Sequence, residues 1–117
     1  MIKRLDTLEV ATSDLADASS IYEKNFSFAV TRSADGKSAL VKVGRAEIRL
    51  VARAIDSSSE GMVGLWFEAE DVDQVVANFH MAGLDAGAIE IESGRRILSI
   101  DPKFANQVPL FIFDRKA

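Results

Sequence analysis

The 117-residue chain contains no cysteine, one histidine and two prolines. The absence of cysteine excludes disulfides, a thiolate zinc site and a thiol nucleophile, and it agrees with a reducing compartment. No apolar run approaches the roughly 20 residues of a membrane-spanning helix. The first residues, MIKRLDTLEV, also lack an apolar run long enough for a signal peptide. We therefore expect a cytoplasmic protein with no membrane partner.

Positive charge is scarce and unevenly distributed. The chain has 14 Lys and Arg against 18 Asp and Glu, a net charge of −4. Residues 1–55 carry nine basic and seven acidic side chains, whereas residues 56–117 carry five and eleven. An acidic chain without a basic stripe excludes nucleic acid as a partner. Apolar residues make up 48% of the sequence, enough for the core of one compact domain.

One strand-to-helix sequence occurs twice. Residues 61–73, GMVGLWFEAEDVD, alternate apolar and acidic side chains before Asp71 or Asp73, either of which can cap a helix. Residues 5–15, LDTLEVATSDL, follow the same pattern before Asp14. The two sequences lie roughly half a chain apart, which indicates a tandem duplication.

Each half of the chain has the pattern of a strand, a helix and three further strands. In the first half we expect strands at 5–12, 27–32, 38–43 and 46–52, with a helix from Asp14 to about Asn25. In the second half we expect strands at 62–70, 88–92, 96–100 and 108–113, with a helix that starts at about Val72 and closes near Gly83. The Ser-rich segment 53–61, RAIDSSSEG, is the predicted linker between modules of about 1–54 and 61–117.

Because proline cannot donate to a strand ladder, pairing of the last strand should be interrupted at Pro109.

This arrangement resembles the vicinal oxygen chelate superfamily, which includes glyoxalases and bleomycin-resistance proteins. The resemblance covers essentially the whole chain and is carried by three segments: LDTLEVATSDLADASSIYEKNFSF, GLWFEAEDVDQVVANFHMAGL and DPKFANQVPLFIFD. It implies an α+β fold in which tandem βαβββ modules form a curved mixed-sheet trough, within a single glyoxalase-like domain of residues 1–117. Members of this family commonly dimerise, and each module is too small to bury both sheet faces, so we expect a homodimer.

Enzymes of this family hold a divalent metal in the trough, with ligands from the first and last strands of each module. Carrying these positions over gives Thr7, Arg49, Gly64 and Pro109, with Glu47 in place of Arg49 if the alignment slips by two residues. Glycine and proline have no side-chain donor, arginine stays cationic and threonine is a poor lone ligand. We therefore expect no metal and no other cofactor. His80, the sole histidine, is expected on the solvated flank of the second helix.

Strand alternation predicts which side chains face the trough. They combine aromatic walls with a few charged groups, and they are Thr7, Glu9, Glu47, Arg49, Gly64, Trp66, Glu68, Pro109, Phe111 and Phe113. Such a mixture is typical of a small-molecule pocket. Trp66 could stack a planar ligand or hold a cation over its ring. The alternative is that the aromatic residues simply fill the sheet interface.

Three of these residues are also candidates for catalysis: Glu9, Glu68 and Arg49. The two glutamates are predicted at equivalent positions in the two copies and are therefore expected to approach each other. Two sheltered carboxylates would raise the pKa of one of them or recruit a cation such as Arg49. The sequence leaves open an acid/base pair and a structural Glu–Arg–Glu cluster.

The resemblance and the trough residues together favour a metal-independent binding protein that holds a small aromatic or cationic ligand. One alternative is a metal-independent lyase, isomerase or other enzyme of the same fold that uses Glu9, Glu68 and Arg49. A second alternative is a non-catalytic accessory subunit. The sequence does not identify the ligand.

Overall fold

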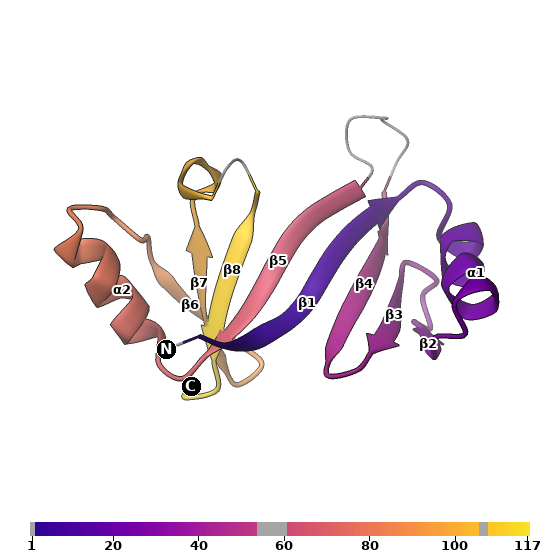
Figure 1. The fold of residues 1–117 in the computed structure, drawn as a ribbon, viewed down its shortest axis with the longest axis horizontal. Helices are drawn as coiled ribbons and strands as arrows, with labels where there is room; N and C mark the ends of the chain where they lie inside the picture. The colour runs from indigo at the N-terminus through magenta and orange to yellow at the C-terminus, as the bar shows by residue number, and fades with distance from the viewer. Residues whose placement is uncertain (1, 54–60, 106–107) are drawn as a thin grey trace. The chain divides into compact units, whose positions relative to one another are not determined.

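The computed structural model describes residues 2–53, 61–105 and 108–117, and most of the predicted linker at 53–61 lies outside these ranges. It divides into an N-terminal unit of residues 6–63 and a C-terminal unit of residues 1–5 and 64–117. Both halves of the chain run in the order strand, helix and further strands (Figure 1). No helix in the described residues is long and apolar enough to cross a membrane.

In the N-terminal unit, helix α1 packs on one face of four strands that lie in the order β2-β3-β4-β1. Neighbours are antiparallel except β1 and β4, which run parallel. The elements are β1 (Ile2–Thr12), α1 (Leu15–Asn25), β2 (Val30–Arg32), β3 (Ser38–Val43) and β4 (Ala46–Ala52).

The C-terminal unit repeats this arrangement, with α2 against strands in the order β5-β8-β7-β6. Here β5 and β8 are the parallel pair. The elements are β5 (Gly61–Ala69), α2 (Val72–Met81), β6 (Ile89–Glu92), β7 (Arg95–Ile100), the short 3₁₀ helix η1 (Pro102–Phe104) and β8 (Leu110–Asp114). No sequence pattern predicted η1, which begins after Asp101 caps its first turn.

The predicted helix-facing side chains form the core of each unit. Leu50 is 1% exposed and packs with Val10 and Ile48 beneath α1. In the C-terminal unit, Ala69 and Ile112 pack with α2 in the same way. Alternation with a period of two therefore assigns these strand faces correctly, because one face of each sheet is covered by a helix.

The helix boundaries follow from their caps. The Asp14 carboxylate accepts a hydrogen bond from Asp17 N at 2.9 Å, and α1 ends at Asn25 as predicted. Strand β2 starts three residues later than predicted, because Ser27 has φ 57° and Phe28 N donates to Tyr22 O at 3.1 Å. This segment closes the helix before the chain becomes extended.

Pro109 lies immediately before β8, which begins at Leu110 and not at the predicted residue 108. The Pro109 carbonyl accepts a hydrogen bond from Leu65 N at 3.0 Å, but proline has no N–H to return to the ladder. The expected interruption at Pro109 is therefore present, and it sets the start of the strand.

A buried carboxylate ties α2 to the sheet of the C-terminal unit. Asp114 is 1% exposed, and its Oδ2 accepts hydrogen bonds from Val72 N at 2.8 Å and Arg96 Nη2 at 2.6 Å. Arg96 also donates through Nε to Asp114 Oδ1 at 3.0 Å and through Nη1 to Asp73 at 2.9 Å. Burial alone would raise the pKa of Asp114, but the bonds from Arg96 and Val72 lower the pKa to about 2.

Replacing this carboxylate should weaken folding in a pH-dependent way. Asp114→Asn is expected to lower the free energy of unfolding at pH 7 by about 3 kcal/mol, because it leaves Arg96 without its buried partner. A carboxylate whose pKa is depressed in the folded state stabilises above its unfolded pKa and loses that effect as pH falls. The deficit of the variant should therefore shrink between about pH 4 and the folded pKa of about 2, measured by urea denaturation.

Glu23→Gln is the matched control, because Glu23 forms an exposed pair with Arg32 in which both side chains are 45% exposed. It should change the free energy of unfolding by less than about 1 kcal/mol. An Asp114→Asn deficit that stays constant from neutral to acidic pH would contradict the role assigned to the carboxylate.

Candidate functional site

Three aromatic side chains lie on the face of the C-terminal sheet that points away from α2. Trp66 in β5 is paired in register with Phe111 in β8, and Phe113 is the next residue on the same face. The Trp66 and Phe111 rings are stacked, with centroids 4.4 Å apart and planes inclined by 17°. Trp66 and Phe113 are tilted at 58° with centroids 6.4 Å apart. We call Trp66, Phe111 and Phe113 the aromatic face.

Burial differs across the aromatic face. Phe113 is 0% exposed, whereas Trp66 and Phe111 are only partly buried. Phe113 therefore serves as a core residue, and the stacked pair keeps ring surface available. A planar molecule placed on that surface would extend an existing stack, which is a favoured arrangement for aromatic groups.

Two arginines lie against these rings. The Arg95 guanidinium carbon is 5.3 Å from the Trp66 centroid and 4.8 Å from the Phe113 centroid. The Arg115 guanidinium carbon is 5.4 Å from the Phe113 centroid. All three distances are within the range of cation–π attraction. Arg95 and Arg115 thus already cover part of the ring surface on which a cationic ligand was predicted to bind.

Glu68, one of the predicted catalytic residues, is buried and paired with basic side chains. It is 6% exposed, its Oε1 accepts from Arg4 Nε at 3.0 Å and its Oε2 accepts from Arg115 Nε at 3.2 Å. Lys3 Nζ lies 4.0 Å from Oε2. The Arg4 bond, with the nearby charges of Lys3 and Arg115, outweighs burial and lowers the pKa of Glu68. A carboxylate held ionised in this way is poorly suited to general acid chemistry near neutral pH.

The prediction that Glu9 and Glu68 occupy equivalent positions is wrong. Counted back from the two capping aspartates, Glu68 corresponds to Ala11, and Glu9 corresponds to Trp66. The strand registers agree, because Glu9 is paired with Arg49 as Trp66 is with Phe111. Alternation with a period of two predicts which face of the sheet each glutamate is on. It does not predict the position along the strand at which the two copies correspond.

The four positions that correspond to the family's metal ligands form one cross-strand pair in each unit. Thr7 in β1 is paired with Glu47 in β4. In the other unit the pairing of Leu65 with Leu110 places Gly64 beside Pro109. The counterpart of Pro109 is therefore Glu47, the alternative that the sequence left open, and not Arg49.

These residues do not fit a divalent metal. Gly64 and Pro109 contribute no side-chain donor, so the second pair cannot supply the side-chain ligands that the family uses. In the first pair, the Thr7 hydroxyl donates to Asp6 Oδ2 at 2.8 Å and the Glu47 carboxylate accepts from Lys42 Nζ at 3.1 Å. Within residues 2–53, 61–105 and 108–117, no group of three or more His, Cys, Asp or Glu side chains could hold an ion.

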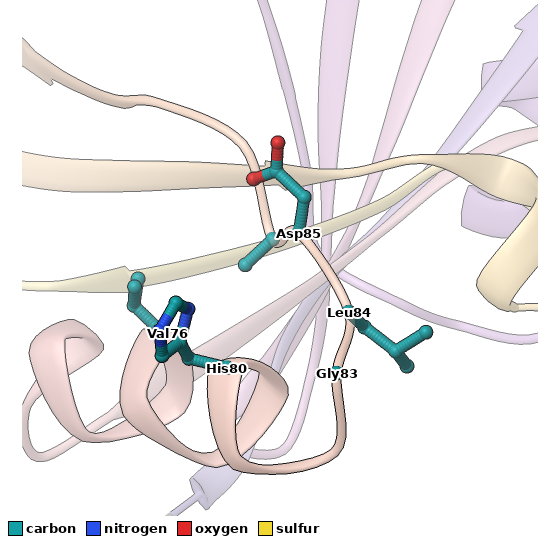
Figure 2. A pocket seen from close by; sticks show the side chains of 6 residues that line it. Val76, His80, Gly83, Leu84 and Asp85 are labelled. Carbon is teal, nitrogen blue, oxygen red and sulfur yellow. The ribbon is translucent and has the colours of Figure 1, made fainter.

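A separate hollow of about 480 Å³ lies at the end of α2 and is shown in Figure 2. It is lined by Val76, His80, Gly83, Leu84, Asp85 and Ala86. His80 is exposed on the helix, as the sequence predicted, and Asp85 lies on the loop that follows. The Asp85 carboxylate accepts from Gly87 N at 2.9 Å, so it stabilises its own loop. The aromatic face is the stronger candidate because its rings and charges converge.

Sequence reasoning identified the rings but missed the cations beside them. The first two, Lys3 and Arg4, lie near the start of the chain, and Arg115 follows the last strand. Alternation gave no information on Lys3 and Arg4, because the predicted strand began at residue 5 whereas β1 begins at Ile2, and none on Arg115, which follows the end of β8. Arg95 could have been found, because it shares the alternation of Ile97 and Ser99, but the predicted strand began one residue later.

The family model of the Glyoxalase/Bleomycin resistance protein/Dioxygenase superfamily matches residues 4–96. The chain belongs to this superfamily, and the predicted α+β fold of glyoxalase type is confirmed. No curated protein matches the chain.

Solved structures of the same fold include methylmalonyl-CoA epimerases. The enzyme from Mycobacterium tuberculosis has a TM-score of 0.75 at 21% identity, covering 97% of this chain and 88% of that chain. A variant of the Streptomyces coelicolor enzyme in complex with 2-nitronate-propionyl-CoA has a TM-score of 0.74 at 20% identity, over 100% of both chains. A hypothetical protein from Bacillus halodurans has a TM-score of 0.71 at 12% identity, with coverage of 97% and 95%. At these identities the likeness shows the fold alone.

The pairing of Glu68 can be tested by titration. In a carbon NMR titration, the Glu68 carboxyl should have a pKa below its ordinary value of 4.5. Arg4→Met should raise that pKa, because it removes the largest cause of the shift and leaves the carboxylate buried.

Arg32→Met removes an exposed arginine from the other unit and should leave the Glu68 titration unchanged. A Glu68 pKa at or above 4.5 in the unsubstituted protein would restore the acid/base interpretation of this residue.

Proposed function

We propose that the protein is a metal-independent small-molecule-binding protein of the glyoxalase/bleomycin-resistance type, which holds a small planar ligand against the aromatic face. The observation that carries the proposal is the stacked pair of Trp66 and Phe111, 4.4 Å apart and only partly buried. Rigid strands position both rings, so little conformational freedom is lost when a ligand stacks on them.

The donor chemistry supports a site without a metal. At the positions that would hold the family's ion, Gly64 and Pro109 have no side-chain donor atoms, and Thr7 and Glu47 already bond to neighbouring side chains. Phe111, two residues beyond Pro109, presents a ring in the same unit. Binding by stacking and by polar contacts is therefore favoured over binding through a metal.

The arginines narrow the ligand class that the sequence left open. Arg95 lies over both Trp66 and Phe113, so a cationic ligand would meet a positive charge at the ring faces. Like charges in a partly desolvated site repel each other. A neutral or anionic planar molecule is therefore favoured over a cationic one.

The enzyme alternative has weaker support from the residues named for it. Glu68 is ionised and held by Arg4 and Arg115, and Glu9 lies opposite Arg49 in the other unit. The epimerases of similar fold include complexes with methylmalonyl-CoA and with 2-nitronate-propionyl-CoA. Acyl-CoA esters are for this reason the first compounds to test for turnover.

Binding can be followed through the only tryptophan of the chain, Trp66. A fluorescence titration with a panel of planar aromatic metabolites and acyl-CoA esters should reveal ligands that change its emission. Phe111→Ala should weaken binding of such a ligand about 5- to 10-fold, because it removes the ring that supports the stack. A chelator should have no effect on the affinity.

Phe26→Ala is the control, since Phe26 is 61% exposed and belongs to the N-terminal unit. It should leave the affinity unchanged. Turnover of an acyl-CoA ester that is abolished by a chelator would overturn the proposal, and so would equal losses of affinity in both variants.

We further propose that residues 1–117 act as one domain of two βαβββ modules and assemble as a homodimer in the cytoplasm. The basis is the resemblance to family members that dimerise and the small size of each module. Static light scattering at micromolar concentration should give about twice the 12.7 kDa mass of the chain. A monomeric mass would contradict the assembly without affecting the ligand site.

A further inference from the structure

Basic side chains gather beside the aromatic face, although the surrounding sequence is acidic. Residues 56–117 carry five basic and eleven acidic side chains. Even so, Lys3, Arg4 and Arg115 converge on the single carboxylate of Glu68. Three basic side chains thus meet at one buried carboxylate in the C-terminal unit.

Arg95 adds a fourth cation next to this group. The Arg95 guanidinium lies over the rings of Trp66 and Phe113. In the described part of the chain, Arg95 forms no ion pair. Glu92 is paired with Arg95 in the β6–β7 register and is the nearest candidate in sequence, but no bond joins the two side chains. A guanidinium placed over rings and free of a carboxylate retains all of its donors for another acceptor.

The two arginines Arg95 and Arg115 lie directly against the aromatic face. Arg95 and Arg115 lie 4.8 and 5.4 Å from the Phe113 ring centroid, and Trp66 is the next ring along. The Arg115 side chain is 60% exposed. Among the described residues it donates to Glu68 through Nε, and its two Nη groups remain for a ligand. The Lys3 side chain is 52% exposed.

We infer that the ligand is a small organic anion, with its planar part on Trp66 and Phe111 and its carboxylate or phosphate bound by Arg95 and Arg115. This inference rests on the proposed function and specifies its ligand class. Arginine is suited to such a role because its planar fork matches carboxylate and phosphate oxygens. Glu68 positions Arg115 by holding Nε at 3.2 Å, so the carboxylate orients a binding group.

The inference can be tested with three probes that share one ring: benzoate, phenyl phosphate and the neutral benzamide. Their dissociation constants can be measured from the shift of the Trp66 indole N–H signal in NMR spectra at low salt. At least one anion should bind about tenfold more tightly than benzamide, the ratio expected for one charge-assisted hydrogen bond. The preferred anion then distinguishes a carboxylate ligand from a phosphate ligand.

Arg95→Gln and Arg115→Gln should each remove most of the preference for the anion over benzamide. Arg115→Gln also removes a hydrogen-bond partner of Glu68 and could therefore weaken folding. Arg95 contacts rings and has no such bond, so Arg95→Gln tests the inference without this complication. Arg32→Gln changes an exposed arginine of the N-terminal unit and should keep the full preference. Added sodium chloride should reduce the preference because it screens exposed charges.

The outcomes separate this inference from the function on which it rests. Equal affinity for benzamide and both anions would overturn the anion inference and leave planar-ligand binding intact. Equal loss of preference in Arg32→Gln would also overturn it, since the effect would then come from net charge. A Trp66 signal that responds to none of the three probes, nor to the wider aromatic panel, would overturn both.

Discussion

The parallel pairing of β5 with β8 is the constraint on which the C-terminal unit depends. It places Phe67 and Ile112 in the core beneath α2, and it places Trp66 beside Phe111 on the opposite face. A slip of one residue would exchange these faces and carry Glu68 into the apolar core. Pro109 helps to fix this register, because it lacks an N–H and its carbonyl accepts from Leu65 just before the strand begins.

Two buried carboxylates lie near the ends of these paired strands, and arginine neutralises both. Asp114 receives two bonds from Arg96 and one from the first residue of α2, so its charge is used to join helix and sheet. Glu68 forms ion pairs with three basic side chains, Lys3, Arg4 and Arg115. In the described residues no buried side-chain nitrogen or oxygen lacks a partner. The first carboxylate therefore joins helix and sheet, and the second holds Arg115, whose guanidinium lies over the Phe113 ring.

The fold could be predicted from the sequence because its signals are local and occur twice. Alternation, helix periodicity and a capping aspartate in each half define both modules, and the helix-facing residues follow from them. The site could be predicted only in part. Alternation correctly gave Trp66 and Phe111 a common face, but it could not fix levels along different strands, so Glu9 and Glu68 were wrongly matched. Residues that reach the site from strand ends, such as Arg115, depend on tertiary packing that no periodicity contains.

The same residues that position charge at this face limit the chemistry that it can perform. A general base must gain a proton in the transition state, and its pKa should lie near the working pH. The pKa of Glu68 is lowered by Arg4, Lys3 and Arg115, and protonation would cost those interactions. Arg95 and Arg115 remain cationic and can only donate hydrogen bonds. Under the proposed function, fixed rings and fixed donors would stabilise an anionic ligand in its ground state, and stabilisation of the ground state alone gives binding without accelerating a reaction.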